Sequence, residues 1–264
     1  SEYTRPAITI ACALVRDSAN PRSTSNTSRR FFVDFIQLRL LEPIKFPYTN
    51  SIGLKLTHPE ILMLPHWEAL DNTRREAGYL TPTETMALLG KSNEVLDPFS
   101  LLISREVVIG SNNRFYPNVT ISRSAGSPID IGDGNIFRGP TLIEADGASV
   151  KIGDRNLFGE GGATIRANQA GASILIGNGC RLIHGATLYG DTRLGDGAQV
   201  LGHITAISCT LEAGGTFDEP EINQRAAVLK GMGTARGIHL ARGQVIDGWG
   251  SFDANLAQPQ SNFH

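Results

Sequence analysis

The 264-residue chain has few cysteines and few aromatic residues. Its three cysteines, Cys12, Cys180 and Cys209, are too widely spaced for a disulfide framework or a Cys-x-x-Cys metal knuckle. Aromatic residues make up only 7% of the sequence, so aliphatic side chains must supply most of the core. Sparse, scattered cysteines are typical of a reducing compartment, and we therefore expect a cytoplasmic protein.

The chain also lacks an excess of one charge and a long apolar run. Its formal net charge is -2 with 19% charged residues, which gives no general attraction to nucleic acid or to an anionic membrane. The longest early apolar run, residues 7–15 (AITIACALV), is too short to span a bilayer. It also fits a cleaved secretory signal poorly. These absences predict a soluble protein with no nucleic-acid or membrane partner.

Glycine, by contrast, is abundant, and most of the 29 glycines follow residue 105, where they mark a repeat. An aliphatic–glycine pair recurs at intervals of eighteen residues plus a short remainder, and aliphatic residues recur every six residues between 176 and 200. A period of six does not match the 3.6-residue helix. It suits short parallel strands joined by tight turns, with three hexads forming one triangular coil. The aliphatic positions of the most regular stretch are Ile176, Leu182, Leu188, Leu194 and Val200.

Segments that break this period are rich in turn-forming residues. Residues 122–128 (SRSAGSP) and 167–173 (ANQAGAS) have no apolar periodicity, so we predict that both are outward loops. The period breaks again at residues 217–227 (FDEPEINQRAA) and is expected to resume at Leu240.

The hexad pattern, an aliphatic residue followed by small or acidic residues over about half of the chain, resembles the hexapeptide-repeat proteins. That resemblance implies a left-handed parallel β-helix, a handedness that departs from the general rule for parallel strands. It also implies a homotrimer with active sites in the clefts between adjacent prisms. We therefore predict a mainly β protein with a β-helix at residues 105–253 and a C-terminal tail at 254–264.

The first 104 residues have a different character and predict a small α/β N-terminal cap domain. Residues 29–43 (RRFFVDFIQLRLLEP) begin with alternating apolar and polar side chains. Thr81, followed by Pro82 and Glu84, predicts a helix start with a capping box. The histidines in this region, His58 and His66, lie beside prolines and are assigned structural or solvent-facing roles.

Residues 94–119 carry a D-P-x-S sequence followed by I-G-x6-P. This segment resembles the entry into the β-helix of bacterial glucosamine-phosphate acetyltransferase/uridyltransferase. The region before it is too short for the nucleotidyltransferase domain of that family and has no glycine-rich phosphate loop. The resemblance therefore implies only the acetyltransferase half.

Counting hexads places Glu160, His184 and His203 at one corner of three consecutive coils, about 4.8 Å apart per coil. The same count continues the column with Glu219. A carboxylate beside an imidazole can orient and charge a general base. The three residues are therefore the candidate catalytic group.

Residues 192–206 (TRLGDGAQVLGHITA) are similar to the acetyltransferase segment in which the histidine of a G-H-[LI]-T motif is the proposed base. The resemblance implies that His203 is the base. The match needs one inserted residue before His203, and Ala206 replaces the aromatic residue of that family. The separation of His184 and His203 also resembles the histidine pair of the nucleotide-sugar acyltransferase of the lipid A pathway.

A metal site is the first alternative. Residues 181–190 (RLIHGATLYG) resemble the γ-class carbonic anhydrase segment that carries two zinc ligands as His-x4-His. Here Tyr189 stands at the second position, and Arg166 stands where a further histidine is expected. One imidazole, His184, cannot replace a three-ligand site, so we predict no metal. A non-catalytic trimeric scaffold, with both histidines at solvent-facing corners, is the other alternative.

Residues 230–237 (KGMGTARG) lack the glycine spacing of a dinucleotide-binding loop and are interpreted as turn glycines. Lys230, Arg236 and Arg242 are candidate ligands for the phosphates of an acyl-CoA co-substrate. The sequence thus predicts an acyltransferase that moves an acyl group from acyl-CoA, or from acyl carrier protein, to an amine or hydroxyl of a sugar-like small molecule. Its partners are expected to be the other subunits of a homotrimer and this acceptor.

Overall fold

The computed structural model describes residues 64–263. Cys12, residues 29–43 and His58, and with them most of the predicted cap domain, lie outside the described residues. The described residues belong to one compact unit, Leu56–His264. None of the helices within 64–263 has the length and hydropathy needed to cross a membrane.

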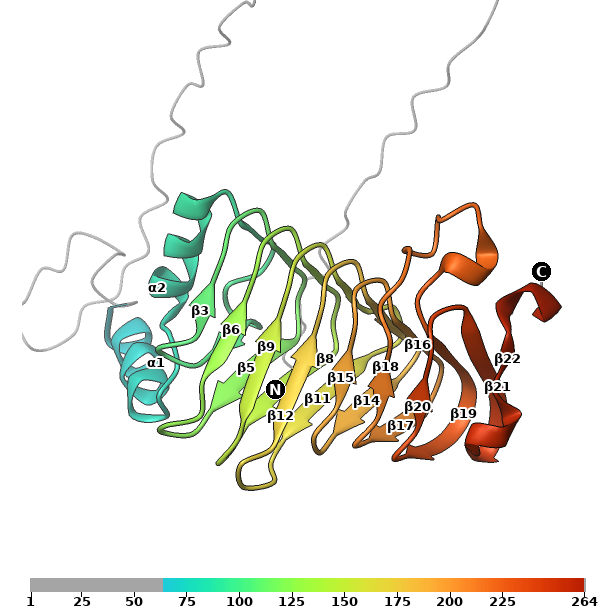
Figure 1. Ribbon diagram of the computed structural model, residues 1–264. Helices are drawn as coiled ribbons and strands as arrows, with labels where there is room; N and C mark the ends of the chain where they lie inside the picture. Colours follow the sequence, from blue (N-terminus) through green and yellow to red (C-terminus); the bar gives the residue numbers. More distant parts are fainter. Residues whose placement is uncertain (1–63, 264) are drawn as a thin grey trace, which may run out of the picture. The chain divides into compact units, whose positions relative to one another are not determined.

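The unit is a left-handed parallel β-helix, whose coils stack as a triangular prism with three faces (Figure 1). Each coil contributes one short strand to each face, and every strand pairs in parallel with its equivalents in the neighbouring coils. The first face consists of β1 (Glu94–Val95), β4 (Arg114–Phe115), β7 (Ile136–Phe137), β10 (Leu157–Gly159), β13 (Arg181–Ile183), β16 (Gln199–Leu201) and the first half of β19 (Val228–Arg236).

The second face begins where each chain segment turns the next corner. It consists of β2 (Leu102–Ile103), β5 (Val119–Arg123), β8 (Thr141–Ala145), β11 (Ala163–Ala167), β14 (Ala186–Tyr189), β17 (Ile204–Ile207) and the second half of β19. The third face consists of β3 (Val108–Ile109), β6 (Ile129–Ile131), β9 (Ser149–Ile152), β12 (Ser173–Ile176), β15 (Arg193–Leu194), β18 (Thr210–Leu211) and β20 (His239–Leu240).

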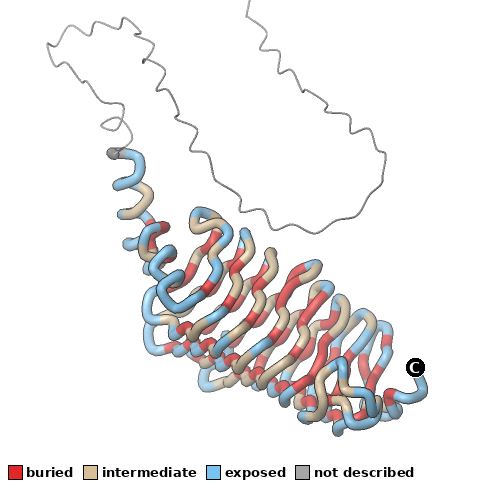
Figure 2. Tube along the Cα trace, turned by 90° about the horizontal axis from the view of Figure 1, so that it is seen from above, coloured by how far each residue is buried: buried red, intermediate tan, exposed pale blue. Residues whose placement is uncertain are grey.

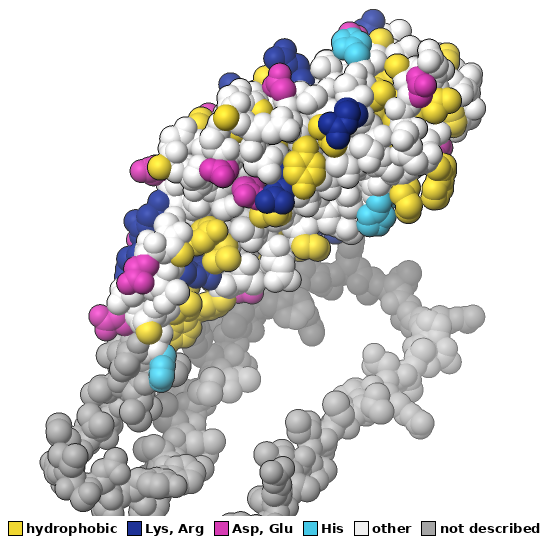
Figure 3. Space-filling model, turned by 90° about the horizontal axis from the view of Figure 1, so that it is seen from below, with side chains coloured by type: hydrophobic (Ala, Val, Ile, Leu, Met, Phe, Trp, Pro, Cys, Tyr) yellow, Lys and Arg dark blue, Asp and Glu magenta, His cyan; other side chains and the backbone are white. Residues whose placement is uncertain are grey.

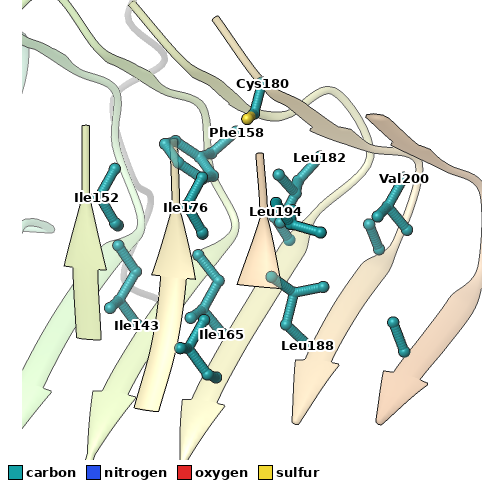
Figure 4. Close-up of a cluster of buried hydrophobic side chains, with 14 of the residues drawn as sticks. Ile143, Ile152, Phe158, Ile165, Ile176, Cys180, Leu182, Leu188, Leu194 and Val200 are labelled. Atoms are coloured by element: carbon teal, nitrogen blue, oxygen red, sulfur yellow. The ribbon is translucent and has the colours of Figure 1, made fainter. Parts of the chain in front are cut away.

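The hexad positions form the core, as the sequence predicts. Buried and more exposed residues alternate along the strands (Figure 2), because successive side chains of a strand point to opposite faces. Figure 4 shows Ile176, Leu182 and Leu194 pointing into the prism with their neighbours, and all three are at most 3% exposed. Removal of these side chains from water is the main favourable contribution to folding.

Two internal ladders along the prism were not predicted. Phe115, Phe137 and Phe158 stack with ring centroids 5.1 and 5.0 Å apart. At the corner between the third and first faces, buried asparagines connect successive coils, because each side-chain Oδ1 accepts a hydrogen bond from the backbone N–H of the next coil. This ladder runs through Asn93, Asn113, Asn135, Asn156 and finally Cys180.

The N-terminal end of the described unit carries α1 (Leu64–Glu76), α2 (Pro82–Met86) and a 3-10 turn (Ala87–Lys91). The predicted capping box is confirmed: the Glu84 N–H donates to Thr81 Oγ1 at 3.1 Å, and the Thr81 N–H donates to Glu84 Oε2 at 2.8 Å. Strand pairing begins at Glu94, before residue 105, because the short strands β1 and β2 already pair with the following coil.

The C-terminal end differs from the hexad count. The predicted interruption at 217–227 is confirmed as a loop, but the coils resume at Val228 in β19 rather than at Leu240. The KGMGTARG segment therefore lies in a strand, and its glycines let this strand bend around a corner with φ of +114° at Gly231 and +139° at Gly233. β21 (Gln244–Ser251) pairs with residues 228–234 of β19, and the tail returns as β22 (Gln258–Pro259), antiparallel to β21.

Candidate functional site

Glu160, His184 and His203 lie on the corner between the first and second faces, which we call the histidine corner (residues 159–162, 184–185 and 202–203). Register places them there: Gly159 pairs with Ile183, and Ile183 pairs with Leu201. The structure therefore brings together the three residues that hexad counting selected. Glu219 is not part of this column, because it lies in the loop before β19.

The two histidines occupy neighbouring columns on this corner. The N–H of His184 donates to the carbonyl of Glu160 at 3.0 Å, so these two residues are adjacent along the prism. Thr187 pairs with Thr205 beyond the corner, which aligns His203 with Gly185 of the preceding coil. On its other side His203 aligns with Met232, because Ile204 pairs with Gly233.

A glycine leaves the space that the His203 imidazole occupies. A Cβ added to Gly185 would collide with Nδ1 of His203, whereas one added to Gly161 would be closest to the backbone of His184, 3.2 Å from its Cα. The His203 ring thus lies over the backbone of the preceding coil. Both histidines are exposed, and no hydrogen bond or ion pair within residues 64–263 engages either imidazole. Both rings therefore have nitrogen atoms with which to exchange a proton with a bound molecule.

Two residues of this corner have an unusual backbone conformation. Glu160 and His184 have φ of +49° and +60°, in the left-handed region that side chains with a Cβ rarely adopt, and six other non-glycine residues within 64–263 share it. Such conformations are held by their surroundings and are common at functional sites. Here they direct two polar side chains outward from consecutive coils.

The carboxylate of Glu160 has a partner other than an imidazole. Its Oε1 lies 3.4 Å from Nε of Arg138 on the preceding coil, and the Arg138 guanidinium lies over the ring of Tyr116, 5.3 Å from its centroid. Among the described residues, the Glu160 carboxylate therefore pairs with Arg138 and not, as was expected, with a histidine imidazole.

The surroundings of His203 differ on its two sides. Toward the N-terminal coils lies an open hollow of about 410 Å³ on the second face, lined by Gly161, Gly162 and Gly185 among others. Toward the C-terminal coils lie Met232 and Trp249, which are 45% and 76% exposed. Figure 3 shows histidine side chains at the surface, one of them beside a group of hydrophobic side chains. The corner thus offers a hollow lined by glycines, threonines and apolar residues on one side of the His203 imidazole and an apolar strip on the other.

The positions compared with carbonic anhydrase lie on adjacent strands of the second face, and one of them forms an ion pair. Arg166 pairs with Tyr189 in the sheet, and its Nε donates to Glu144 Oε2 at 2.8 Å. The adjacent Glu144 carboxylate raises the pKa of Arg166. Within residues 64–263 no three His, Cys, Asp or Glu side chains are grouped so that they could hold a metal ion. The side chains around His184 therefore do not fit a three-ligand zinc centre.

The three predicted phosphate ligands do not form one cluster. Lys230 is on the first face, where its Nζ lies 2.9 Å from Oδ2 of Asp247. Arg236 ends β19 on the second face, and Arg242 follows β20 of the third face. Lys230 lines a cavity of the described unit together with cations and aromatic side chains from distant segments, a combination that neither motif nor periodicity predicts.

A comparison with protein-family models gives no match to the chain. A comparison with curated proteins gives none either.

Proposed function

We propose that the protein is an acyltransferase that moves an acyl group from acyl-CoA, or from acyl carrier protein, to an amine or hydroxyl of a sugar-like small molecule, with His203 as general base. The observation that carries this proposal is the placement of the exposed His203 imidazole between a glycine-lined hollow and an apolar strip. Asn118, Thr120 and Thr164, which help to line the hollow, are the groups proposed to hydrogen-bond the acceptor. Met232 and Trp249 suit the apolar part of an acyl donor.

In the proposed reaction the acceptor lies in the hollow and its amine or hydroxyl donates a hydrogen bond to His203. The imidazole removes this proton as the acceptor attacks the thioester carbonyl. The new C–N or C–O bond forms, the C–S bond breaks, and the imidazolium returns its proton to the departing thiolate. His184, one coil away, is available to hydrogen-bond the acceptor and to hold it in line for the attack.

A covalent cysteine mechanism does not fit the described cysteines. Cys180 is buried inside the prism, and this burial raises the pKa of its thiol to about 12. Burial also raises the pKa of Cys209. Thiols in such surroundings are poor nucleophiles, which supports direct transfer.

The proposal includes a homotrimer, in which the histidine corner of each prism would face a neighbouring prism. The apolar hexad register and the resemblance to hexapeptide-repeat proteins support it. Static light scattering at micromolar concentration should give three times the mass of one chain. A stable monomer would remove the intersubunit part of the proposal.

The decisive experiment measures thiol release from acetyl-CoA with glucosamine phosphate as the first acceptor, together with the melting temperature of the full chain in the presence of acyl-CoAs. A bound acyl-CoA should raise the melting temperature, and His203→Ala should lower turnover by roughly 10²–10⁴-fold. The matched control is His239→Ala, because His239 is an exposed histidine on the third face, paired with Glu212 at 3.0 Å. Full turnover in both His203→Ala and His184→Ala would show that this corner is not the catalytic site.

A further inference from the structure

A second cavity, of about 320 Å³, lies on the first face at the C-terminal end of the prism. Its floor includes Gln199, Leu201 and Val228 from adjacent strands β16 and β19. One wall comes from the loop before β19 and carries Phe217, and the opposite wall comes from the C-terminal tail and carries Phe263. Neither histidine nor Glu160 lines this cavity, so it is distinct from the histidine corner.

The two walls hold each other in place. The side chain of Asn223 in the loop exchanges two hydrogen bonds of 3.1 Å with Ser261 of the tail. The buried Gln260 donates through Nε2 to the carbonyl of Ala226 at 2.6 Å. Because loop and tail are connected in this way, the cavity is built before any ligand arrives, which lowers the entropic cost of binding.

The cavity carries an excess of positive charge. Arg181, Arg225 and Lys230 line it, and no Asp or Glu does. The Lys230 charge is balanced by Asp247, whereas neither arginine has a carboxylate partner within residues 64–263. Arg181 has a hydrogen bond to the neutral Gln199, at 3.4 Å, and Arg225 donates to a backbone carbonyl at 2.8 Å, while its charge also lowers the pKa of the exposed Asp218. Two guanidinium groups without a direct ion-pair partner in a cavity favour an anion, and phosphate matches their geometry best.

Two aromatic rings stand at the rim above these cations. Phe217 is 53% exposed and Phe263 is 41% exposed. Arg181 lies over the Phe217 ring at 4.7 Å and Lys230 over the Phe263 ring at 5.9 Å, measured to the centroids. Exposed rings beside cations can stack on a planar ring while the cations hold its charged substituent.

We propose that this cavity binds a nucleoside phosphate, with its base stacked on Phe217 or Phe263 and its phosphate on Arg181 and Arg225. The volume lies at the lower end of the range for ligand pockets, which suits one nucleoside phosphate rather than a dinucleotide. This chemistry is shared by a free mononucleotide and by the nucleotide end of a larger molecule. Binding here does not depend on acyl transfer at the histidine corner.

The test is isothermal titration calorimetry of the full chain with adenosine monophosphate, uridine monophosphate, adenosine and inorganic phosphate. We expect saturable binding of at least one monophosphate, at least 10-fold tighter than adenosine or phosphate alone. Titration with adenosine 3',5'-bisphosphate distinguishes a free mononucleotide from the nucleotide end of a larger molecule. Tighter binding of the bisphosphate than of adenosine monophosphate indicates the nucleotide end of a coenzyme, and equal or weaker binding indicates a free nucleotide.

Variants localise the site. Arg181→Gln and Phe217→Leu should each weaken binding at least 10-fold, whereas Arg193→Gln, which removes an exposed arginine from β15 of the third face, should not. His203→Ala should bind normally, so failure of acyl transfer and failure of this proposal are separable. Unchanged circular dichroism and melting temperature show that each variant is folded. Absence of saturable monophosphate binding, or equal weakening by Arg193→Gln, would overturn the proposal, as would phosphate alone binding as tightly as the nucleotides.

Discussion

The imidazole of His203 lies directly against the backbone of Gly185 on the preceding coil, in the space that a Cβ at position 185 would occupy. Gly185 has φ of +88°, so its conformation and its missing side chain both serve this contact. The histidine is thus positioned by the absence of an atom rather than by a hydrogen bond from a neighbour. This relationship gives a test that leaves the imidazole itself unchanged.

Gly185→Ala should displace the His203 ring and reduce the proposed acyl transfer by about 10²-fold, because a displacement of about 1 Å can cost that much. The free energy of unfolding should fall by only about 1–2 kcal/mol, the usual cost of a Cβ in the left-handed region. Initial rates and urea denaturation at one protein concentration measure the two effects.

Gly126→Ala is the matched control for backbone strain. Gly126 has φ of +76°, and a Cβ there would meet no atom within 4 Å. This variant should show a similar loss of stability with full activity. An equal loss of activity in both variants would mean that the position of His203 does not matter to turnover.

Arg138 should control the electrostatics of the histidine corner through Glu160. Arg138→Gln removes the cation 3.4 Å from the Glu160 carboxylate and leaves a negative charge beside His184. An unpaired carboxylate changes the electric field in which the proposed proton transfer takes place, so Arg138→Gln should lower the rate of acyl transfer, though by less than His203→Ala. Initial rates at saturating acetyl-CoA measure this effect.

Glu160→Gln separates the effect of the Glu160 charge from any other effect of Arg138. If Glu160 only modulates the charge, this variant should cost less activity than His203→Ala and should abolish the effect of Arg138→Gln in the double variant. Arg193→Gln, on the third face, should leave the rate unchanged. Identical initial rates in wild type and Arg138→Gln would show that this ion pair does not influence turnover.

The periodic part of this fold could be predicted because each hexad depends on local rules. A six-residue spacing places Ile176 and Leu194 at equivalent positions of successive coils, and both are buried. The same count brings Glu160, His184 and His203 to one corner, since register in a solenoid is inherited from one coil to the next.

The features that the sequence did not predict depend on contacts between distant segments. The partner of Glu160 is Arg138, 22 residues earlier in the chain, and no hexad rule selects a side chain there. The glycines of residues 230–237 predict a turn, but most of these residues lie in β19, a strand that bends around a corner. The second cavity requires the loop before β19 to meet the C-terminal tail, a pairing that neither composition nor periodicity reveals.

Cys180 and Cys209 should not react with thiol reagents in the folded protein. The raised pKa of Cys180, about 12, leaves roughly 10⁻⁴ of its thiol ionised at pH 8, and only the thiolate is reactive. Cys12→Ser restricts the measurement to these two thiols, and a dithiobisnitrobenzoate assay should then give no release until urea unfolds the protein. Because the folded state holds this proton more tightly, stability should fall as pH rises from about 9, the unfolded value, toward about 12. Rapid native-state labelling would show that the prism opens locally at these coils.

The buried asparagine ladder should be a major source of stability, and Asn135→Leu tests it. The Asn135 Oδ1 accepts from the backbone N–H and from Nδ2 of Asn156, both at 2.9 Å, and its own Nδ2 donates to the carbonyl of Gly153 at 3.0 Å. Leucine has a similar size but leaves these buried groups without partners, each costing about 1–3 kcal/mol. We therefore expect the free energy of unfolding to fall by about 3–5 kcal/mol in urea denaturation at fixed protein concentration. Asn168→Leu makes the same chemical change in an exposed loop and should alter stability by less than about 0.5 kcal/mol; equal effects of the two variants would show that the ladder contributes nothing.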